Sequence, residues 1–209
     1  MSPVSIDAIA PPRIDLARTP TPLEFLTHTS REMGVDIYVK RDDYTGMELS
    51  GNKIRKLEFI MADALASDAD TIITCGGAQS NHARATAIAA AKLGLDCRLI
   101  LRTADPSAPP APDGNILLNC MAGAQIVWIT PEEYRHREDI FQREETLLRQ
   151  QGRNPYSIPE GASNALGAWC YIRAMKERVQ GMFQRLKGRS AAPRSLRPPV
   201  PGAQPPACL

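Results

Sequence analysis

Short apolar runs alternate with helical patterns along most of the chain, and this alternation limits the folds open to it. Residues 71–74 fit a buried strand, residues 81–93 an alanine-rich helix and residues 97–101 the next strand. A strand–helix–strand unit of this kind favours a parallel sheet with right-handed crossovers. The pattern recurs more loosely as far as about residue 176. The sequence therefore predicts an α/β fold with an open, doubly wound, mainly parallel sheet.

Other segments fit the same alternation. Ile54, Leu57 and Met61 recur at helical spacing, which predicts a helix from about residue 53 to residue 66. The other predicted elements are strands at 37–40, 125–129 and 156–159 and helices at 115–121, 131–151 and 165 to about 176. Beyond them, the basic, proline-rich segment 178–209 is expected to be disordered, because it holds too few large apolar side chains to offset the entropy of folding.

The charge and the cysteine content exclude several classes of function. With 25 Lys and Arg against 23 Asp and Glu, the formal net charge is +2, so neither nucleic acid nor a membrane surface is expected as a partner. The five cysteines are an odd number without a Cys-x-x-Cys pair, which predicts neither disulfides nor a metal site. There is no secretory signal and no apolar stretch long enough to span a bilayer, so we expect a cytoplasmic protein.

A lysine at the start of a predicted helix is the first candidate for chemistry. Lys53 directly follows Gly51 and Asn52 at the end of a polar loop. The partial positive charge of a helix N-terminus disfavours an ammonium ion and favours the neutral amine that a Schiff base with an aldehyde requires. The alternative is that Lys53, Arg55 and Lys56 form a solvent-facing helix surface, which on spacing alone is the more frequent case.

The second candidate site is the turn at residues 75–82. Gly76 and Gly77 allow close backbone approach, and the following helix N-terminus offers N–H groups to a carboxylate or phosphate. Ser80 and Asn81 add a hydroxyl and an amide. Open α/β sheets bind their ligands at such turns, at the carboxyl ends of the strands.

Taken alone, this turn is explained better by ordinary structural roles. Ser80 or Asn81 would serve as an ordinary helix N-cap, and His82 as a helix-start histidine with a hydrogen-bond partner. A third segment, residues 161–167, has the same order of strand, small polar loop and helix, and its chemistry is less specific. A helix cap with a glycine for close helix packing explains this segment equally well.

Three motifs occur in one order along the chain: Ser50-Gly51-Asn52-Lys53-x-Arg55-Lys56-Leu57-Glu58, Gln79-Ser80-Asn81-His82, and Pro159-Glu160-Gly161-Ala162-Ser163-Asn164-Ala165-Leu166-Gly167. The runs Thr19–Leu23 and Lys40–Asp43 accompany them. Together they resemble the D-cysteine desulfhydrases and 1-aminocyclopropane-1-carboxylate (ACC) deaminases, pyridoxal-phosphate (PLP) enzymes of the tryptophan-synthase-β type. The resemblance covers about residues 19–176.

The resemblance implies a role for each motif. Lys53 would hold pyridoxal 5′-phosphate as a Schiff base and later move the substrate's α-proton, and Ser80 would act with it as the second catalytic residue. Asn81, on the 3′-oxygen of PLP, and Asn52 would complete the cofactor-binding set. The substrate-binding residues that it implies are Gln79, Ser80 and His82.

The implied reaction converts D-cysteine, a small amino-acid substrate, to pyruvate, sulfide and ammonia. ACC deaminase activity is the alternative, and His82 together with residues 163–167 favours the desulfhydrase. A homodimer is implied for the full-length family. A second alternative is a remnant that binds an anion or a partner without catalysis.

Members of that family are much longer than this chain, and no Gly-Thr-Gly-Gly-Thr-like run follows Lys176. The predicted organisation is an N-terminal part of a large domain at 1–52, a small α/β domain at 53–158, a return into an incomplete large domain at 159–177, and a tail at 178–209. A chain without the rest of the large domain is expected to bind PLP weakly and to turn over little or no substrate.

Overall fold

The computed structural model describes residues 9–46 and 51–189, with side chains as far as residue 183. Four strands form a parallel sheet in the order β5-β4-β3-β6. These strands are β3 (Thr71–Gly77), β4 (Asp96–Arg102), β5 (Gln125–Ile129) and β6 (Pro155–Ile158). β3 is buried along its whole length up to Gly77, as expected for a strand paired on both sides.

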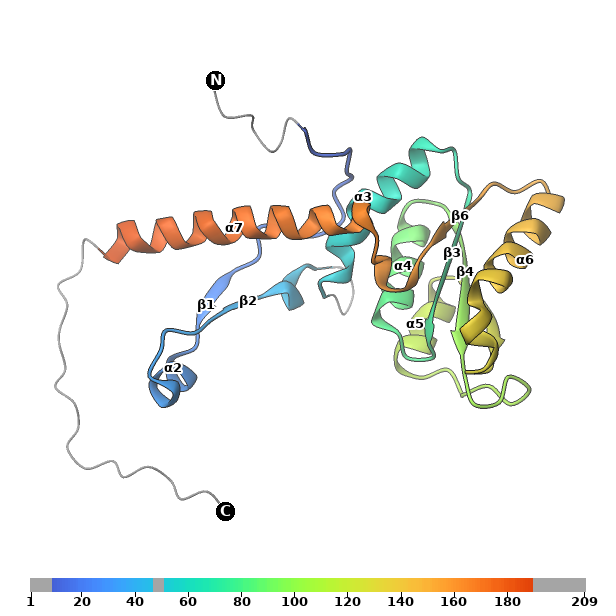
Figure 1. Cartoon of the computed structure of the whole chain (residues 1–209), viewed down its shortest axis with the longest axis horizontal. Helices are drawn as coiled ribbons and strands as arrows, with labels where there is room; N and C mark the ends of the chain where they lie inside the picture. Colours follow the sequence, from blue (N-terminus) through green and yellow to red (C-terminus); the bar gives the residue numbers. More distant parts are fainter. Residues whose placement is uncertain (1–8, 47–50, 190–209) are drawn as a thin grey trace, which may run out of the picture.

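Helices cover both faces of this sheet (Figure 1). They are α3 (Lys53–Ala66), α4 (Asn81–Lys92), α5 (Gly114–Met121) and α6 (Arg137–Gln150). Because side chains alternate along a strand, Ile72 and Leu99 pack with α3 and α4 on one face, whereas Ile73 and Ile100 pack with α6 on the other. The predicted α/β fold with a doubly wound parallel sheet is confirmed.

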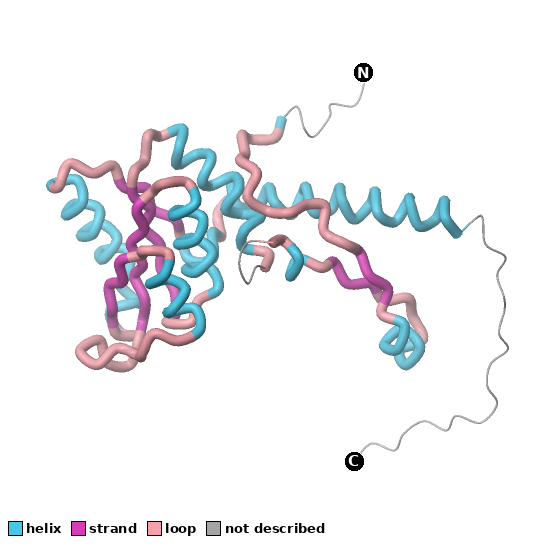
Figure 2. Tube along the Cα trace, turned by 180° about the vertical axis from the view of Figure 1, so that it is seen from behind, coloured by secondary structure: helices cyan, strands magenta, loops and turns pink. Residues whose placement is uncertain are grey.

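A second part of the molecule extends away from this sheet along the long axis, as Figures 1 and 2 show from opposite sides. Its elements are β1 (Leu23–Phe25), α2 (Thr27–Met33), β2 (Tyr38–Lys40), the 3₁₀ turn η1 (Asp42–Tyr44) and α7 (Ala165–Arg189). β1 and β2 pair in antiparallel fashion. α7 packs against α3 near its start and then runs past β1, so this helix contacts both parts.

Two predicted helix boundaries are wrong. The charged helix predicted at 131–151 begins with a 3₁₀ turn, η2 (Glu133–His136), because Thr130 and Glu133 cap each other: each side chain accepts the backbone N–H of the other residue. α7 continues to Arg189 instead of ending near Lys176, so 178–189 is helical although it was expected to be disordered. The remainder of that expected tail, 190–209, lies outside the described residues.

α7 carries an apolar stripe that nothing covers in the described part of the chain. The exposed side chains at helical spacing are those of Ile172, Met175, Val179, Met182 and Phe183. Spacing of three and four residues places them on one side of the helix. Within the same described residues, no helix is both long and apolar enough to cross a membrane.

Candidate active site

The three sequence motifs meet at the carboxyl edge of the parallel sheet. Lys53 is the first residue of α3, Ser80 precedes α4 just after β3, and Gly161 lies in the 3₁₀ turn η3 (Glu160–Ala162) just after β6. Lys53 Nζ lies 3.2 Å from the position that a Cβ atom on Gly161 would occupy. The first and third motifs are therefore in direct contact, although they are more than a hundred residues apart.

Gly161 is needed at this point for two reasons. Its φ of +66° lies in the left-handed region, which side chains disfavour. A side chain there would also press on Lys53 Nζ and on Ser163 Oγ, at 3.2 and 3.3 Å from its Cβ. The glycine thus leaves room for the lysine amine.

The predicted alternative of a solvent-facing basic surface is wrong for two of the three basic residues. Arg55 and Lys56 are only 3% and 6% exposed, whereas Lys53 is half-buried. Lys56 Nζ donates hydrogen bonds to Gly161 O at 3.1 Å and to Ser163 Oγ at 3.2 Å. Lys56 therefore holds η3 in place beside Lys53.

Arg55 ties the start of α3 to the second part of the molecule. Its guanidinium binds Asp42 Oδ1 at 2.9 Å, both oxygens of Glu177 at 2.9 and 3.0 Å, and Thr21 Oγ1 at 2.9 Å. Lys40 Nζ binds the same Glu177 carboxylate at 2.7 Å. We call these five residues the Arg55 network, and they connect the first turn of α3 to β2, η1 and α7.

Ser80 is an N-cap, as one prediction from the sequence had it. Its hydroxyl oxygen accepts the backbone N–H of Ala83 at 3.2 Å. Gly76 permits this arrangement, because a Cβ there would lie 2.7 Å from Ser80 Oγ. Capping does not exclude a ligand role: Ser80 is half-buried, and its hydroxyl proton remains free to be donated.

The side chains of Gln79 and Asn81 are exposed and lie against the start of α5. Asn115 Nδ2 donates to Gln79 O at 2.8 Å and to Asn81 Oδ1 at 3.0 Å, and the Asn115 backbone N–H donates to Gln79 Oε1 at 2.8 Å. Asn115 thus orients the second motif. It was not predicted as a site residue, although Asp113-Gly114-Asn115 has the composition of a helix start.

Asn52 and the third motif meet the first turns of α7. Asn52 Nδ2 donates to Tyr171 OH at 3.2 Å. Asn164 Oδ1 accepts the Gly167 backbone N–H at 2.8 Å and so caps α7. A Cβ on Gly167 would overlap Ala162 O, so the glycine allows α7 to pack closely against η3.

His82 is the buried member of the second motif, with 3% of its surface exposed. Its Nε2 lies 2.8 Å from Thr74 Oγ1, and its Nδ1 has no hydrogen-bond partner within the described residues. Burial, together with the positive charges of Lys53 and Lys56, lowers the pKa of His82 to about 3. The imidazole is therefore neutral near pH 7.

The buried His82 should make stability depend on pH. Its pKa of about 3 in the folded state lies below its ordinary value of 6.5, so between these values only the unfolded chain binds the proton. Stability should therefore fall on acidification below pH 6.5, with a slope of roughly 1.4 kcal/mol per pH unit. Urea denaturation of wild type and His82→Asn checks this: the stability difference should be constant above pH 7 and should shift against wild type below pH 6. Parallel pH curves would contradict it.

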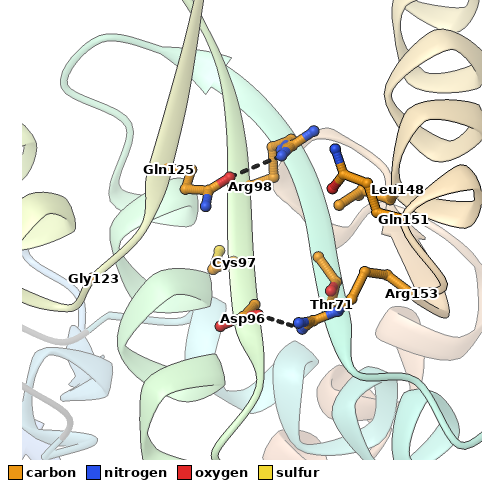
Figure 3. Close-up of a pocket in the computed structure, with 9 residues that line it drawn as sticks. All are labelled: Thr71, Asp96, Cys97, Arg98, Gly123, Gln125, Leu148, Gln151 and Arg153. Atoms are coloured by element: carbon orange, nitrogen blue, oxygen red, sulfur yellow. Dashed lines mark hydrogen bonds and ion pairs between the residues drawn. The ribbon is translucent and has the colours of Figure 1, made fainter.

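A cavity of about 300 Å³ lies at the opposite, amino edge of the sheet, between the strands and α6 (Figure 3). Its two arginines are already paired. Arg98 binds Gln125 and Glu144, and Arg153 binds Asp96 as well as Asp70. This cavity therefore offers a ligand no unpaired cation among the residues that line it, and it is separate from the meeting point of the motifs.

The family model described as "Pyridoxal-phosphate dependent enzyme" matches residues 14–188, most of the chain. The chain belongs to this family. The match extends beyond the predicted limits of 19–176 at both ends. Its C-terminal extension coincides with the unexpected length of α7.

Curated relatives that match this chain include proteins named for D-cysteine desulfhydrase, for ACC deaminase and for both activities. The chain is 47% identical over 166 residues to the mitochondrial bifunctional D-cysteine desulfhydrase/ACC deaminase of Arabidopsis thaliana, covering 78% of this chain and 41% of that protein. It is 44% identical over 173 residues to the D-cysteine desulfhydrase of Salmonella typhi, covering 81% and 52%. The chain thus spans about half the length of the curated relatives it matches.

Solved structures agree with this assignment. The structure of an ACC deaminase homologue superposes with a TM-score of 0.69 at 40% identity, covering 80% of this chain and 50% of that one. The structure of a T.th. threonine deaminase superposes with a TM-score of 0.58 at 18% identity, which shows the fold alone. The predicted tryptophan-synthase-β-like fold and the predicted family are confirmed.

The residues at the carboxyl edge fit the family's cofactor. An amine that makes no hydrogen bond within the described residues suits a Schiff base with an aldehyde, and the N-terminus of α4 suits an anion. The buried Nδ1 of His82, which has no partner there, is a further sign of a site built for a polar group. The individual roles of Lys53, Ser80, Asn81 and Asn52 stay predictions.

Proposed function

We propose that this chain provides the lysine-bearing half of a PLP-dependent lyase that acts on a small amino acid, with D-cysteine as the first candidate. The observation that supports this most is the placement of the Lys53 amine beside Gly161, at the same sheet edge as the Ser80 turn. This juxtaposition unites three motifs that the sequence spreads over more than a hundred residues. Bound PLP would supply an electron sink for the substrate's α-carbon.

The chain's own residues would bind, orient and move a proton. Lys53 would hold the cofactor through its amine and, once freed, take up the α-proton. The backbone N–H groups at the start of α4 would bind the substrate carboxylate, because a helix N-terminus attracts anions. Ser80 would donate its hydroxyl proton to the substrate, while Asn81 and Asn52 would contact the cofactor.

The identity of the substrate is the second part of the proposal. A relative named putative ACC deaminase and one named D-cysteine desulfhydrase are 47% and 44% identical to this chain, so overall identity does not choose between the substrates. The run Ser80-Asn81-His82 and residues 163–167 resemble the desulfhydrase branch and so favour D-cysteine. Loss of its β-thiol as sulfide, followed by hydrolysis, would give pyruvate and ammonia. ACC deaminase activity, which would instead give 2-oxobutyrate, is the second candidate.

The domain organisation is proposed on the same basis. Residues 53–158 would form the small domain, which coincides with the parallel sheet and its helices in Figure 1. Residues 1–52 and 159–177 would belong to a larger domain. A homodimer is proposed for the complete enzyme.

Trapping with borohydride tests the proposal. The purified chain would be incubated with PLP and reduced with borohydride, and the modified lysine identified by peptide mass spectrometry. Lys53 should carry most of the cofactor. Lys53→Met should abolish this modification, whereas Lys92→Met, at the exposed end of α4, should leave it unchanged.

Product assays then separate the candidate substrates. Sulfide release from D-cysteine and 2-oxobutyrate formation from ACC would be measured in parallel. Modification spread equally over exposed lysines would refute the proposal, because Lys53 would then be no more reactive towards PLP than the other lysines.

A further inference from the structure

Two nitrogen atoms at the carboxyl edge of the sheet, one buried and one on a half-buried side chain, make no hydrogen bond within the described residues. His82 Nδ1 is buried without a hydrogen bond from any described residue. Lys53 Nζ, beside Gly161, makes none with the described residues either. An unsatisfied polar group in a buried site is costly and therefore calls for an explanation.

The hydroxyl of Thr74 determines which nitrogen of His82 carries the proton. Thr74 Oγ1 donates its single proton to Ile158 O at 2.9 Å, and it lies 2.8 Å from His82 Nε2. With that proton used, the Thr74 oxygen can only accept from Nε2–H. The ring is thus held as the Nε2–H tautomer, and its Nδ1 presents a lone pair to a donor.

Lys53 is the donor that matches this lone pair. Lys53 and Lys56 are the two cations whose charges act on the ring. Lys56 Nζ already donates to Gly161 O and Ser163 Oγ, whereas Lys53 Nζ has no acceptor among the described residues. The long, flexible stem of a lysine allows its amine to move within such a site.

We propose that His82, held by Thr74, is a positioning residue for Lys53: its Nδ1 accepts a hydrogen bond from the Lys53 amine and turns the nitrogen lone pair towards the open side of the site. This inference rests on the proposed function, in which that amine reacts with an aldehyde. A neutral ring is required, because an imidazolium has no lone pair to offer and would repel an ammonium. In this role no proton is transferred between His82 and Lys53.

Nitrogen NMR of the histidines tests the hydrogen bond without PLP. The full chain has three histidines, so His82→Asn assigns the His82 signals by their disappearance. Wild type should show the Nε2–H tautomer, with the Nδ1 resonance shifted from that of a free acceptor. Lys53→Met should move this resonance to the free position. A change with Lys56→Met and none with Lys53→Met would overturn the proposal.

The rate of borohydride trapping of PLP on Lys53 tests the consequence. His82→Leu, which removes the acceptor, should slow trapping roughly threefold to tenfold, the worth of one hydrogen bond. His82→Asn keeps an oxygen near the Nδ1 position and should restore most of the rate, so a folding defect of the leucine variant would not obscure the result. Thr74→Val should also slow trapping, and Thr74→Ser should not.

These outcomes separate the two proposals. If wild type is not trapped at Lys53, the proposed function fails, and the NMR result still decides the hydrogen bond. If wild type is trapped and His82→Leu reacts at the same rate as His82→Asn, the positioning role alone fails.

Discussion

Replacing Arg55 with methionine is expected to lower the free energy of unfolding by about 3–5 kcal/mol, the usual effect of removing one partner from a buried ion pair. Arg55 is 3% exposed and holds Asp42 and Glu177, whose side chains are 22% and 14% exposed. Without the guanidinium, two poorly hydrated carboxylates would face each other with Lys40 as the remaining cation of the network. Urea denaturation, followed by circular dichroism, measures the loss.

The control for this prediction is Arg135→Met. Arg135 pairs with Glu132 on the surface, where the two side chains are 73% and 69% exposed, and solvent screens such pairs. The control should unfold at the same urea concentration as wild type. If Arg55→Met also unfolds with wild type, the Arg55 network does not hold the two parts of the molecule together.

Acid should weaken the same network. Burial acts to raise the pKa of Glu177, but hydrogen bonds from Arg55 and Lys40 outweigh it and hold this pKa below the usual value. The network's contribution is therefore complete at neutral pH and is lost as the pH falls through the lowered pKa. The stability difference between wild type and Arg55→Met should shrink in that range.

Replacing Gly167 with alanine is expected to destabilise the chain by about 1–3 kcal/mol, as overpacking does. The new Cβ would overlap Ala162 O and lie 3.2 Å from Asn164 Oδ1. Because the first of these is a backbone atom, η3 must move, and Gly161 beside Lys53 must move with it. Thermal unfolding measures the loss, and slower trapping of PLP on Lys53 would report the displaced turn.

Gly181→Ala, in the same helix, is the matched control, and its effect on stability should have the opposite sign. Its Cβ would lie 3.9 Å from Leu23, an ordinary contact. Alanine in a helix interior is about 0.5–1 kcal/mol more favourable than glycine, so this variant should be more stable than wild type. Equal effects of the two substitutions would contradict the close packing of α7 on η3.

Most of the parallel sheet can be predicted from the sequence, because the residue patterns that indicate its strands, turns and helices are each contained within a short segment. The apolar run at 71–74, the glycines that follow it and the alanine-rich helix are all read within a few residues. The helix at 53–66 agrees with α3 at both ends. Ser80 as an N-cap was predictable for the same reason, since capping depends on the next three residues.

Long-range contacts explain what the sequence alone could not predict. Nothing near Arg55 indicates its burial, because its partners Asp42 and Glu177 lie 13 and 122 residues away. The environment of His82 depends likewise on Thr74 in β3 and Ile158 in β6. β1 and α2 carry weak local signals, since a three-residue strand and a seven-residue polar helix depend on their neighbours.

The Arg55 network also bears on the timing of synthesis. Glu177 leaves the ribosome 122 residues after Arg55, which is roughly 6–24 s at ordinary translation rates. Throughout that interval the nascent chain can form its first helix and sheet, and Asp42 is the carboxylate of the network that is already present to pair with the guanidinium. The second carboxylate of the Arg55 network is thus translated only after all four strands of the parallel sheet, so the link between α3 and α7 can form only after the sheet has been made.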